Sequence, residues 1–459
     1  MVVIKFGGSC ISSKDNLETL VSIVKSSLDE NPVLIVSAPS GITARLKEIS
    51  YELSTKKYSR ADELNERNQV TTVYYNEIFS KYISLAKEVD LEFKEVELGM
   101  EFYGSLMSTI SPDTFLRVRD SILSIGERLS ARLIAQLLSN NGLESKAYDA
   151  YNLGLITDSN YGNAHFNLSS LKPISMGIKN LRGVPVITGF IGKDKDGNIT
   201  TLGANSSDYS AVIFAVASED TEVKTYKTVD GILTADSKLV ENPKTVTGLS
   251  YNEASELAGF GADVITARSV KLAAAYNITI VVLNLNNPDK NFTVISKESD
   301  NKSSIKVITS KNNTHLMNVS SAEMVDEPGH AARIYEILGR YKIPVDMIST
   351  SETGISSSFD LFMKDRKRMD EKIDLSRLEA ELKTEYEVEV EDGKAIISLI
   401  GENASNNSEI LSRVFGVLSR EKINVEMLSH RRKSCNLTLL APQEYERQIV
   451  RALHKEFFE

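Results

Sequence analysis

The chain has 459 residues, 41% of them hydrophobic and 25% charged, which predicts two to four globular domains. Its net charge of −10 argues against a nucleic acid or an anionic membrane as partner, because both are bound through a basic face. The only two cysteines, Cys10 and Cys435, are far apart in the sequence, which argues against a disulfide framework and fits the cytoplasm. No apolar run reaches the ~18 residues that a membrane span needs.

The first 40 residues alternate short apolar runs with a helical pattern. Val2–Phe6 and Val33–Val36 are predicted to be buried strands, and Asn16–Leu28 repeats apolar residues at helical spacing. This β-α-β order predicts a parallel sheet covered by helices. Because a strand begins almost at residue 1, we expect no signal or transit peptide.

A long helical and charged stretch follows, from about Thr43 to Leu138, and we interpret it as the lid or wall of a substrate site. Strand patterns then return and surround one further helix, expected from Ser207 to Ala217. These strands are predicted at Val184–Thr188, Ile199–Leu202, Glu222–Tyr226 and Thr279–Leu283. The polar segment Asn286–Ser304 is expected to mark the end of the first domain.

The C-terminal part contains an internal repeat. Ile337–Thr350 and Val417–His430 align with seven of 14 positions identical, and each follows an amphipathic helix and enters a predicted strand, at Val345 or Val425. Chance similarity of two helix–strand junctions is the weaker alternative, because apolar pattern and polar identities agree together. Two copies of one small α+β unit are therefore predicted.

The first chemical motif is Lys5-Phe6-Gly7-Gly8-Ser9, at the end of the first strand. A lysine at the end of a buried strand is costly unless its ammonium group meets an anion. Two glycines let the backbone approach a ligand closely and point N–H groups at it. The motif predicts a phosphate cradle, although a lysine reaching solvent past an ordinary Gly-Gly turn fits the same residues equally well.

A second candidate is the small-residue loop Thr200–Ser206, which leads into the helix expected at Ser207 or Asp208. Free N–H groups and the positive dipole end of a helix suit phosphate, and Asp208 could orient Lys5. The alternative is that Ser207 and Asp208 are ordinary N-caps. The third candidate, Glu127 within Ser124–Ser130, could bind a substrate ammonium at a helix start, but the residues alone favour a capping role.

In order and spacing, these motifs resemble the aspartate kinase family. The family pattern combines K-F-G-G-[ST]-S, a G-E helix start, T-L-G-R-x-G-S-D, T-D-x-x-G, F-G-A-K-V-L-H-P and two C-terminal ACT domains, and the resemblance covers essentially the whole chain. Because the sequence ends after the second repeat, we expect no fused homoserine dehydrogenase of the kind that some relatives carry, so the likeness is to monofunctional members. The implied fold is an α/β amino-acid kinase domain with a mostly parallel sheet, followed by two α+β, ferredoxin-like ACT domains. The implied boundaries are 1–300 for the kinase domain, 314–388 for the first ACT domain, and 305–313 with 389–459 for the second.

The resemblance implies that ATP, with Mg²⁺, phosphorylates the side-chain carboxylate of L-aspartate. Lys5 would stabilise the transferring phosphoryl group, and Asp208 would organise Lys5. Backbone N–H groups at Gly7, Gly8 and Ser9 would hold phosphate oxygens. The other implied ATP- and phosphate-binding residues are Ser207, Lys227, Thr228, Asp236 and Lys238. The implied substrate-binding residues are Ser37, Thr43, Glu127, Phe190 and Asn205, and no metal-ligating residue is expected.

The chain departs from the family pattern at several positions. Ala204 replaces the Arg that, in the family, clamps a substrate carboxylate, and Asp263 replaces a nucleotide-binding Lys. Lys227-Thr228 stands where the family has Thr-Asp near adenine, and Leu233 replaces an aromatic residue. Three interpretations stay open: a divergent aspartate kinase, a kinase for another acidic amino acid or carboxylate, or a weak regulatory paralogue. Retention of the Lys5 and Asp208 motifs favours an active enzyme.

The C-terminal repeats resemble ACT domains that bind amino-acid effectors, and residues 345–352 are similar to the V-D-x-I-x-T-S-E segment of lysine-inhibited relatives. This implies feedback inhibition by L-lysine, whereas the alternative is that Asp346 and Glu352 are solvated strand-edge charges. ACT strands pair between chains in the family, which implies a homodimer or a dimer of dimers. The implied effector-binding residues are Met324, Asp326, Val345, Asp346, Ser351 and Glu352.

Overall fold

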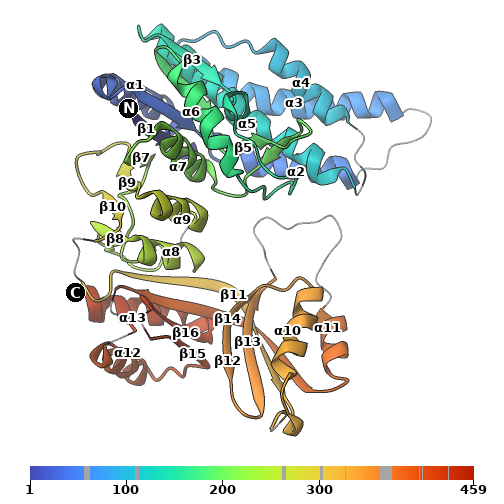
Figure 1. Ribbon diagram of the computed structural model, residues 1–459, viewed down its shortest axis with the longest axis vertical. Coiled ribbons are helices and arrows are strands. Elements are labelled where there is room, and N and C mark those ends of the chain that lie inside the picture. Colours follow the sequence, from blue (N-terminus) through green and yellow to red (C-terminus); the bar gives the residue numbers. More distant parts are fainter. Residues whose placement is uncertain are drawn as a thin grey trace. The chain divides into compact units, whose positions relative to one another are not determined.

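The structure, a computed structural model shown in Figure 1, forms two compact units that are described here one at a time. The first unit consists of residues 1–232, 247–251 and 265–299, and the second of residues 233–246, 252–264 and 300–459. The residues described are 1–55, 63–108, 111, 113–260, 265–299, 303–325, 327–361, 375–402, 404–405, 407–432 and 434–459.

The first unit is built on an eight-stranded sheet. Its strands are ordered β3-β4-β2-β1-β7-β9-β10-β8, and every neighbouring pair is parallel except β9 and β10. The predicted α/β class with a mostly parallel sheet is confirmed. The strands are β1 (Val2–Phe6), β2 (Pro32–Val36), β3 (Ser145–Tyr148), β4 (Val184–Thr188), β7 (Glu222–Lys227), β8 (Gly248–Ser250), β9 (Thr279–Asn284) and β10 (Thr293–Ser296).

The central strands are mostly apolar because both of their faces are covered. All five residues of β1, β2 and β4 are buried. Helix α5 (Phe115–Asn140) packs on β2, β3 and β4, and α7 (Ser207–Ser218) packs on β1, β2 and β7. Alternate residues of β1 therefore meet different helices: Ile4 and Phe6 join the core that contains α5, so Lys5 points to the other face.

The stretch after β2 is helical, as predicted. It forms α2 (Ile42–Thr55), α3 (Glu63–Glu88), α4 (Val96–Met107) and α5. The other elements of the first unit are α1 (Lys14–Ser26), the hairpin of β5 (Ile191–Lys193) and β6 (Ile199–Thr201), α6 (Leu171–Lys179) and α9 (Ala267–Tyr276). The segment Asn286–Ser304, predicted to be a boundary, contains β10 of the large sheet, because Val294 and Ile295 pair with both β9 and β8.

The second unit carries a six-stranded antiparallel sheet in the order β12-β13-β11-β14-β16-β15. The predicted repeat corresponds to α10 followed by β12 and to α12 followed by β15, although Val425 precedes its strand by two residues. The strands are β11 (Val307–Ser320), β12 (Val345–Thr350), β13 (Gly354–Asp360), β14 (Glu387–Ile400), β15 (Met427–His430) and β16 (Asn436–Pro442). The helices are α8 (Tyr251–Gly259), which joins this unit from Asn252 on, α10 (His330–Arg340), α11 (Leu375–Leu382), α12 (Ser408–Glu421) and α13 (Glu446–Phe458).

Strand β11 belongs to both repeats. Its residues before Lys311 pair with the end of β14, whereas its residues from Thr314 on pair with β13 and the beginning of β14. The register shifts between Lys311 and Thr314, where the strand passes from one hydrophobic cluster to the other. The two small α+β units therefore share one continuous sheet.

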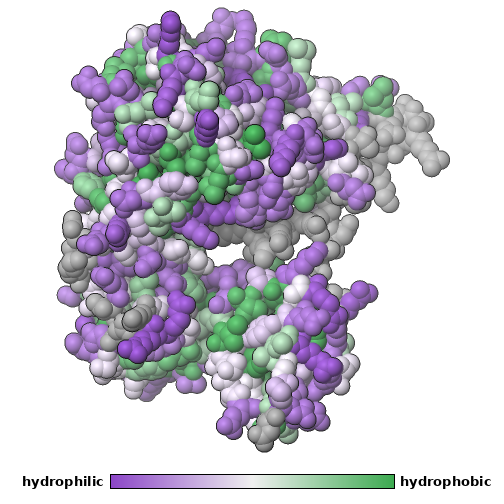
Figure 2. Space-filling view, viewed as in Figure 1, coloured by the Kyte–Doolittle hydropathy of each residue, from purple (hydrophilic) through white to green (hydrophobic). Residues whose placement is uncertain are grey.

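On the face seen in Figure 2, hydrophilic side chains predominate and apolar ones gather in patches. Among the described helices, none combines the length and the apolar character needed to cross a bilayer.

Candidate active site

A buried ion pair lies where β1 ends and α7 begins. Lys5 Nζ is 2.7 Å from Asp208 Oδ1, and both side chains are only 6% exposed. Lys5 reaches Asp208 because β1 directs it to the face that α7 covers, and Asp208 lies in the first turn of that helix. The N-cap of α7 is Ser206, whose side chain makes no capping bond, so Ser207 and Asp208 are not the N-caps considered above. Two residues some 200 positions apart are thus joined at one point.

A second lysine shares the same carboxylate. Strand β7 runs parallel to β1 with Phe6 opposite Tyr226, so Lys227 follows at the same edge, and its Nζ lies 3.6 Å from Asp208 Oδ2. Burial lowers the pKa of Lys227, although Asp208 opposes that change. Burial alone would raise the pKa of Asp208, but the charges of Lys227 and Lys5 hold it below its ordinary value. Two ammonium groups against one carboxylate leave a positive charge, which suits a phosphate.

The glycine turn after β1 approaches neighbouring backbone closely. A Cβ atom on Gly8 would lie 2.4 Å from the Ala38 carbonyl oxygen, so only glycine fits there. The amide of Gly7 donates to Tyr226 O at 3.1 Å and is not available to a phosphate, which corrects its predicted role. The amides of Gly8 and Ser9, at the start of a short 3-10 turn, remain as the donors of the cradle.

Glu127 lies in the middle of α5, so the predicted helix start and capping role are wrong. Gly126 lets α5 approach β2, because a Cβ atom there would lie 2.7 Å from Ala38 Cβ. Glu127 Oε1 accepts the Ala38 amide at 3.2 Å, whereas Oε2 is buried and has no hydrogen-bond partner among the described residues. Burial raises the pKa of Glu127 to about 8. An orphaned carboxylate oxygen in such a place is suited to an ammonium group.

The loop between β4 and α7 is held in strained conformations. Phe190 and Asn205 have positive φ angles of 67° and 56°. Phe190 N donates to Ser210 Oγ at 3.0 Å, and a Cβ atom on Gly189 would lie 2.7 Å from Ser207 Cβ. Such strain is common at ligand sites.

The other predicted residues of the first unit follow strand ends or begin a helix. Ser37 N donates to Phe6 O at 3.3 Å at the end of β2, Thr43 lies half-buried in the first turn of α2, and Thr228 follows β7. Asp236, which accepts the Lys238 amide at 2.8 Å, and Leu233 belong to the second unit. Asp263 lies outside the described residues.

The predicted effector residues lie in the second unit. Asp346, on the edge strand β12, forms a 2.8 Å ion pair with Lys311, so it is not a solvated charge. Glu352 is exposed, as the alternative interpretation expects. Met324 and Val345 pack against the core around α10, and Ser351 N donates to Gly354 O at 2.8 Å. Asp326 lies outside the described residues.

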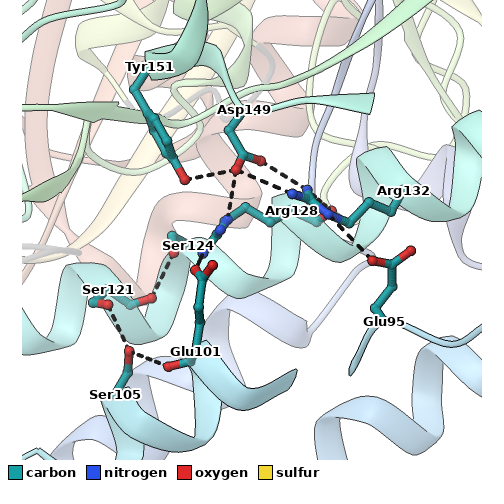
Figure 3. A network of polar contacts seen from close by, with 9 residues as sticks. All are labelled: Glu95, Glu101, Ser105, Ser121, Ser124, Arg128, Arg132, Asp149 and Tyr151. Carbon is teal, nitrogen blue, oxygen red and sulfur yellow. Dashed lines mark hydrogen bonds and ion pairs between the residues drawn. The ribbon is translucent and has the colours of Figure 1, made fainter. Parts of the chain in front are cut away.

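A charge network centred on the buried Asp149 was not predicted from the sequence. Asp149 accepts Arg128 Nε at 3.1 Å, Arg132 Nη1 at 3.0 Å and the Tyr151 hydroxyl at 2.8 Å (Figure 3). Arg128 also contacts Glu101 at 2.7 Å, and these residues line a cavity of about 800 Å³. The spacing of Arg128 and Arg132, one helical turn apart, was the available signal. The network fixes α5 and with it the neighbouring Glu127.

Comparison with known proteins places this geometry in context. Residues 1–284 match the amino acid kinase family, and residues 317–359 and 397–457 match an ACT domain. The whole chain is 31% identical to aspartokinase 2 (chloroplastic) of Arabidopsis thaliana over 84% of that protein. It is 28% identical to lysine-sensitive aspartokinase 3 of Escherichia coli over 99% of that protein.

Two solved structures are similar over their full length. The complex of E. coli aspartokinase III with aspartate and ADP, in the R-state, has a TM-score of 0.80 at 26% identity. The complex of the same enzyme with lysine and aspartate, in the T-state, has a TM-score of 0.74 at 26% identity. Each covers 100% of both chains.

Proposed function

The chain belongs to the amino acid kinase family and, within it, to the aspartokinases, and on this basis we propose that it transfers the γ-phosphoryl group of ATP to the side-chain carboxylate of L-aspartate. The observation that carries the proposal is the buried group of Lys5, Asp208 and Lys227 at the start of α7. Phosphoryl transfer depends mainly on positioning and charge neutralisation, and this arrangement offers both.

Each part of the site has a task in this reaction. Lys5 and Lys227 neutralise the phosphate oxygens, Asp208 fixes both ammonium groups, and the amides of Gly8 and Ser9 with the first turn of α7 add neutral donors. The described residues hold no cluster of three or more metal-ligating side chains, so Mg²⁺ fits as an ion brought in on the nucleotide phosphates, where it adds positive charge.

Glu127 binds the α-ammonium group of aspartate. Its free Oε2 supports this role, because an ammonium ion would satisfy the orphaned oxygen and restore the charged form of the carboxylate. Ser37, Thr43, Phe190 and Asn205 complete the substrate-binding residues of the proposal, with Ser207 and Thr228 on the nucleotide side.

The direct test measures ADP release from Mg-ATP in the presence of L-aspartate. We expect aspartate-dependent turnover in the natural chain and a loss of at least a thousandfold in kcat for Lys5→Ala, since the phosphoryl group loses its main cation. No turnover with aspartate, or equal turnover by Lys5→Ala, would refute the proposal. Because Ala204 replaces a carboxylate-clamping Arg, the same assay includes L-glutamate, and preference for it would favour the second candidate, a kinase for another acidic amino acid.

The proposal extends to regulation through the ACT region by L-lysine. The Asp346 carboxylate already holds the ammonium group of Lys311, which is the chemistry that a free lysine side chain requires. We expect lysine to inhibit turnover, and Asp346→Asn to weaken that inhibition without changing uninhibited kcat. Inhibition by L-threonine instead would identify a different effector.

We also propose a homodimer, or a dimer of dimers, that forms through the ACT sheets, in the cytoplasm. Strand β12 is an edge of its sheet, and Ile348 on it is 51% exposed, so the edge is open to pairing with another chain. Sedimentation equilibrium tests this part: a monomer at micromolar concentration would contradict it.

A further inference from the structure

The proposed reaction needs a cation that the residues discussed so far do not supply. An aspartate molecule has a second carboxylate, next to its ammonium group, while Lys5 and Lys227 are both engaged with Asp208. At the loop position where the resemblance to aspartate kinases implies an arginine, this chain has Ala204. We propose that Arg268, from a different helix, supplies the guanidinium group that binds this α-carboxylate. The inference rests on the proposed function and names the residue that recognises its substrate.

Arg268 is fixed against the loop that contains Ala204. It is the second residue of α9, and its Nη1 donates to Leu202 O and to Ala164 O, both at 3.2 Å. Leu202 N in turn donates to Phe190 O at 2.8 Å. Leu202 therefore connects Arg268 to Phe190, a predicted substrate-binding residue. Leu202 also lies two positions before Ala204 in the sequence.

A short chain of side chains orients the guanidinium group. Arg268 Nη2 lies 3.2 Å from His165 Nε2, and His165 Nδ1 lies 3.0 Å from Asp158 Oδ2. With the proton of the imidazole on Nδ1, directed at Asp158, Nε2 is free to accept from Arg268. Asp158 and His165 are thus positioning residues that hold one side of the guanidinium in place.

The remaining side of the guanidinium group is open to a ligand. Arg268 Nε makes no hydrogen bond with any residue in the described ranges, and Nε and Nη2 together form the fork that carboxylates bind in a bidentate manner. The side chain is neither fully buried nor fully exposed. Arg268 can therefore bind the carboxylate that an arginine at position 204 would bind.

The surroundings favour an anion. Helices α7 and α9 pack together, and both begin beside this loop, so two positive helix ends add to the charge of Arg268. The field of Arg268 reaches Tyr209, the neighbour of Asp208: burial raises the pKa of Tyr209, and the arginine opposes that rise. The competing explanation is that Arg268 only holds the loops at Ala164 and Leu202 together and does not bind the substrate.

The first experiment separates these explanations by steady-state kinetics. Since a bidentate pair to a charged group is lost, we expect Arg268→Ala to raise the KM for aspartate at least tenfold while kcat and the KM for ATP change less than threefold. Arg268→Lys, which keeps the charge without the fork, should fall between. Arg182→Ala, an exposed arginine in the same unit, is the matched control and should leave all three constants unchanged.

The second experiment moves the guanidinium group back to the loop. In Arg268→Ala/Ala204→Arg we expect the KM for aspartate to return to within about threefold of the natural value, which a merely structural role of Arg268 would not allow. The competitive inhibitor 3-aminopropanoate, which is aspartate without its α-carboxylate, should have the same inhibition constant against the natural enzyme and Arg268→Ala.

Three results would overturn the inference. The first is an unchanged KM for aspartate in Arg268→Ala. The second is a fall in kcat and in ATP affinity of Arg268→Ala as large as its loss of aspartate affinity. The third is that Arg268→Ala loses affinity for 3-aminopropanoate as much as for aspartate. If Arg268→Ala does not fold, Arg268→Lys decides the matter by the same constants. Failure of the proposed function is distinguishable, because the natural chain itself would then show no aspartate-dependent turnover.

Discussion

Asp208 sets the charge balance of the phosphate site, because two ammonium groups face its two oxygens. Lys5 was expected there from the glycine motif that follows it. Lys227 was expected among the ATP- and phosphate-binding residues, but its contact with Asp208 emerges only from the parallel register of β1 and β7. A sequence motif shows the order of residues along one strand, but it does not show which other strand pairs with it.

We predict that Lys227→Ala lowers kcat/KM for ATP by roughly tenfold to a hundredfold, because one charge-assisted contact to phosphate is lost. The matched control is Lys224→Ala on the same strand, since Lys224 pairs with Glu30 instead. Initial rates at varied ATP concentration measure both. Equal effects of the two substitutions would show that Lys227 does not contact the nucleotide.

Glu127 makes substrate binding depend on pH. Its pKa of about 8 means that the carboxyl group is mostly protonated in the free enzyme at neutral pH. A bound ammonium group favours the ionised form, so aspartate binding should release a proton below pH 8. The apparent affinity for aspartate should therefore rise with pH up to about 8 and then level off.

Calorimetry in two buffers of different ionisation enthalpy checks this release at pH 6.5. We expect close to one proton released by the natural chain and none by Glu127→Gln, which cannot ionise. Identical heats in both buffers for the natural chain would contradict the prediction.

The junctions between elements were harder to predict than the elements themselves. Strands β1 and β4 have the predicted bounds because their apolar runs are continuous, and α7 begins where the small-residue loop indicated. Glu127 was misplaced because Gly126 looked like a break before a helix. The glycine instead gives α5 room to pass Ala38, a contact that depends on tertiary packing.

The polar segment Asn286–Ser304 was expected to end the first domain, and the first unit does end within it, at Ser299. Asparagine, lysine and serine indicated a boundary, yet Thr293–Ser296 adds a strand to the sheet. The buried network around Asp149 was missed as well, because its arginines and carboxylate come from separate elements. The motifs of the site could be found from the sequence, but the residues that hold the site in place through tertiary contacts could not.

We predict that Gly189→Ala damages the junction of β4 with α7. The new Cβ would lie 2.7 Å from Ser207 Cβ, so the start of the helix must shift, at a cost of about 1–3 kcal/mol. The melting temperature should fall by several degrees and kcat with it. Gly104→Ala is the control, because nothing lies within 4 Å of its added methyl group and alanine suits a helix interior better. A harmless Gly189→Ala would show that the helix start tolerates displacement.

One ion pair of the second unit is completely removed from water. Lys306 Nζ is 2.8 Å from Glu253 Oε2, and both side chains are 0% exposed. The ion pair links Lys306, the residue before β11, to Glu253 on helix α8. Helix α8 belongs to the part of the sequence that matches the kinase family, and β11 belongs to the sheet of the second unit. Desolvation offsets most of the attraction within such a buried pair.

We predict that Lys306→Met destabilises the protein by about 3–5 kcal/mol, because it removes the cation that faces the buried Glu253 carboxylate. The double variant Lys306→Met/Glu253→Met should recover most of this loss. Lys383→Met is the control, since its ion pair with Glu379 is exposed and such pairs contribute about 0–1 kcal/mol. Differential scanning calorimetry measures all three, and a double variant as unstable as the single one would disprove the explanation.

Residues 233–246 belong to the second unit although they precede the last strands of the first. Thr234 accepts the Ile308 amide at 2.8 Å and its hydroxyl lies 2.9 Å from His454 Nε2, while Ala235 and Val240 join the core around α12 and α13. Cutting the gene after codon 300 would therefore yield a fragment in which Ala235 and Val240 are exposed and the Thr234 carbonyl has lost the Ile308 amide. Variants intended to escape the proposed inhibition by lysine should therefore change single effector-binding residues and keep residues 301–459.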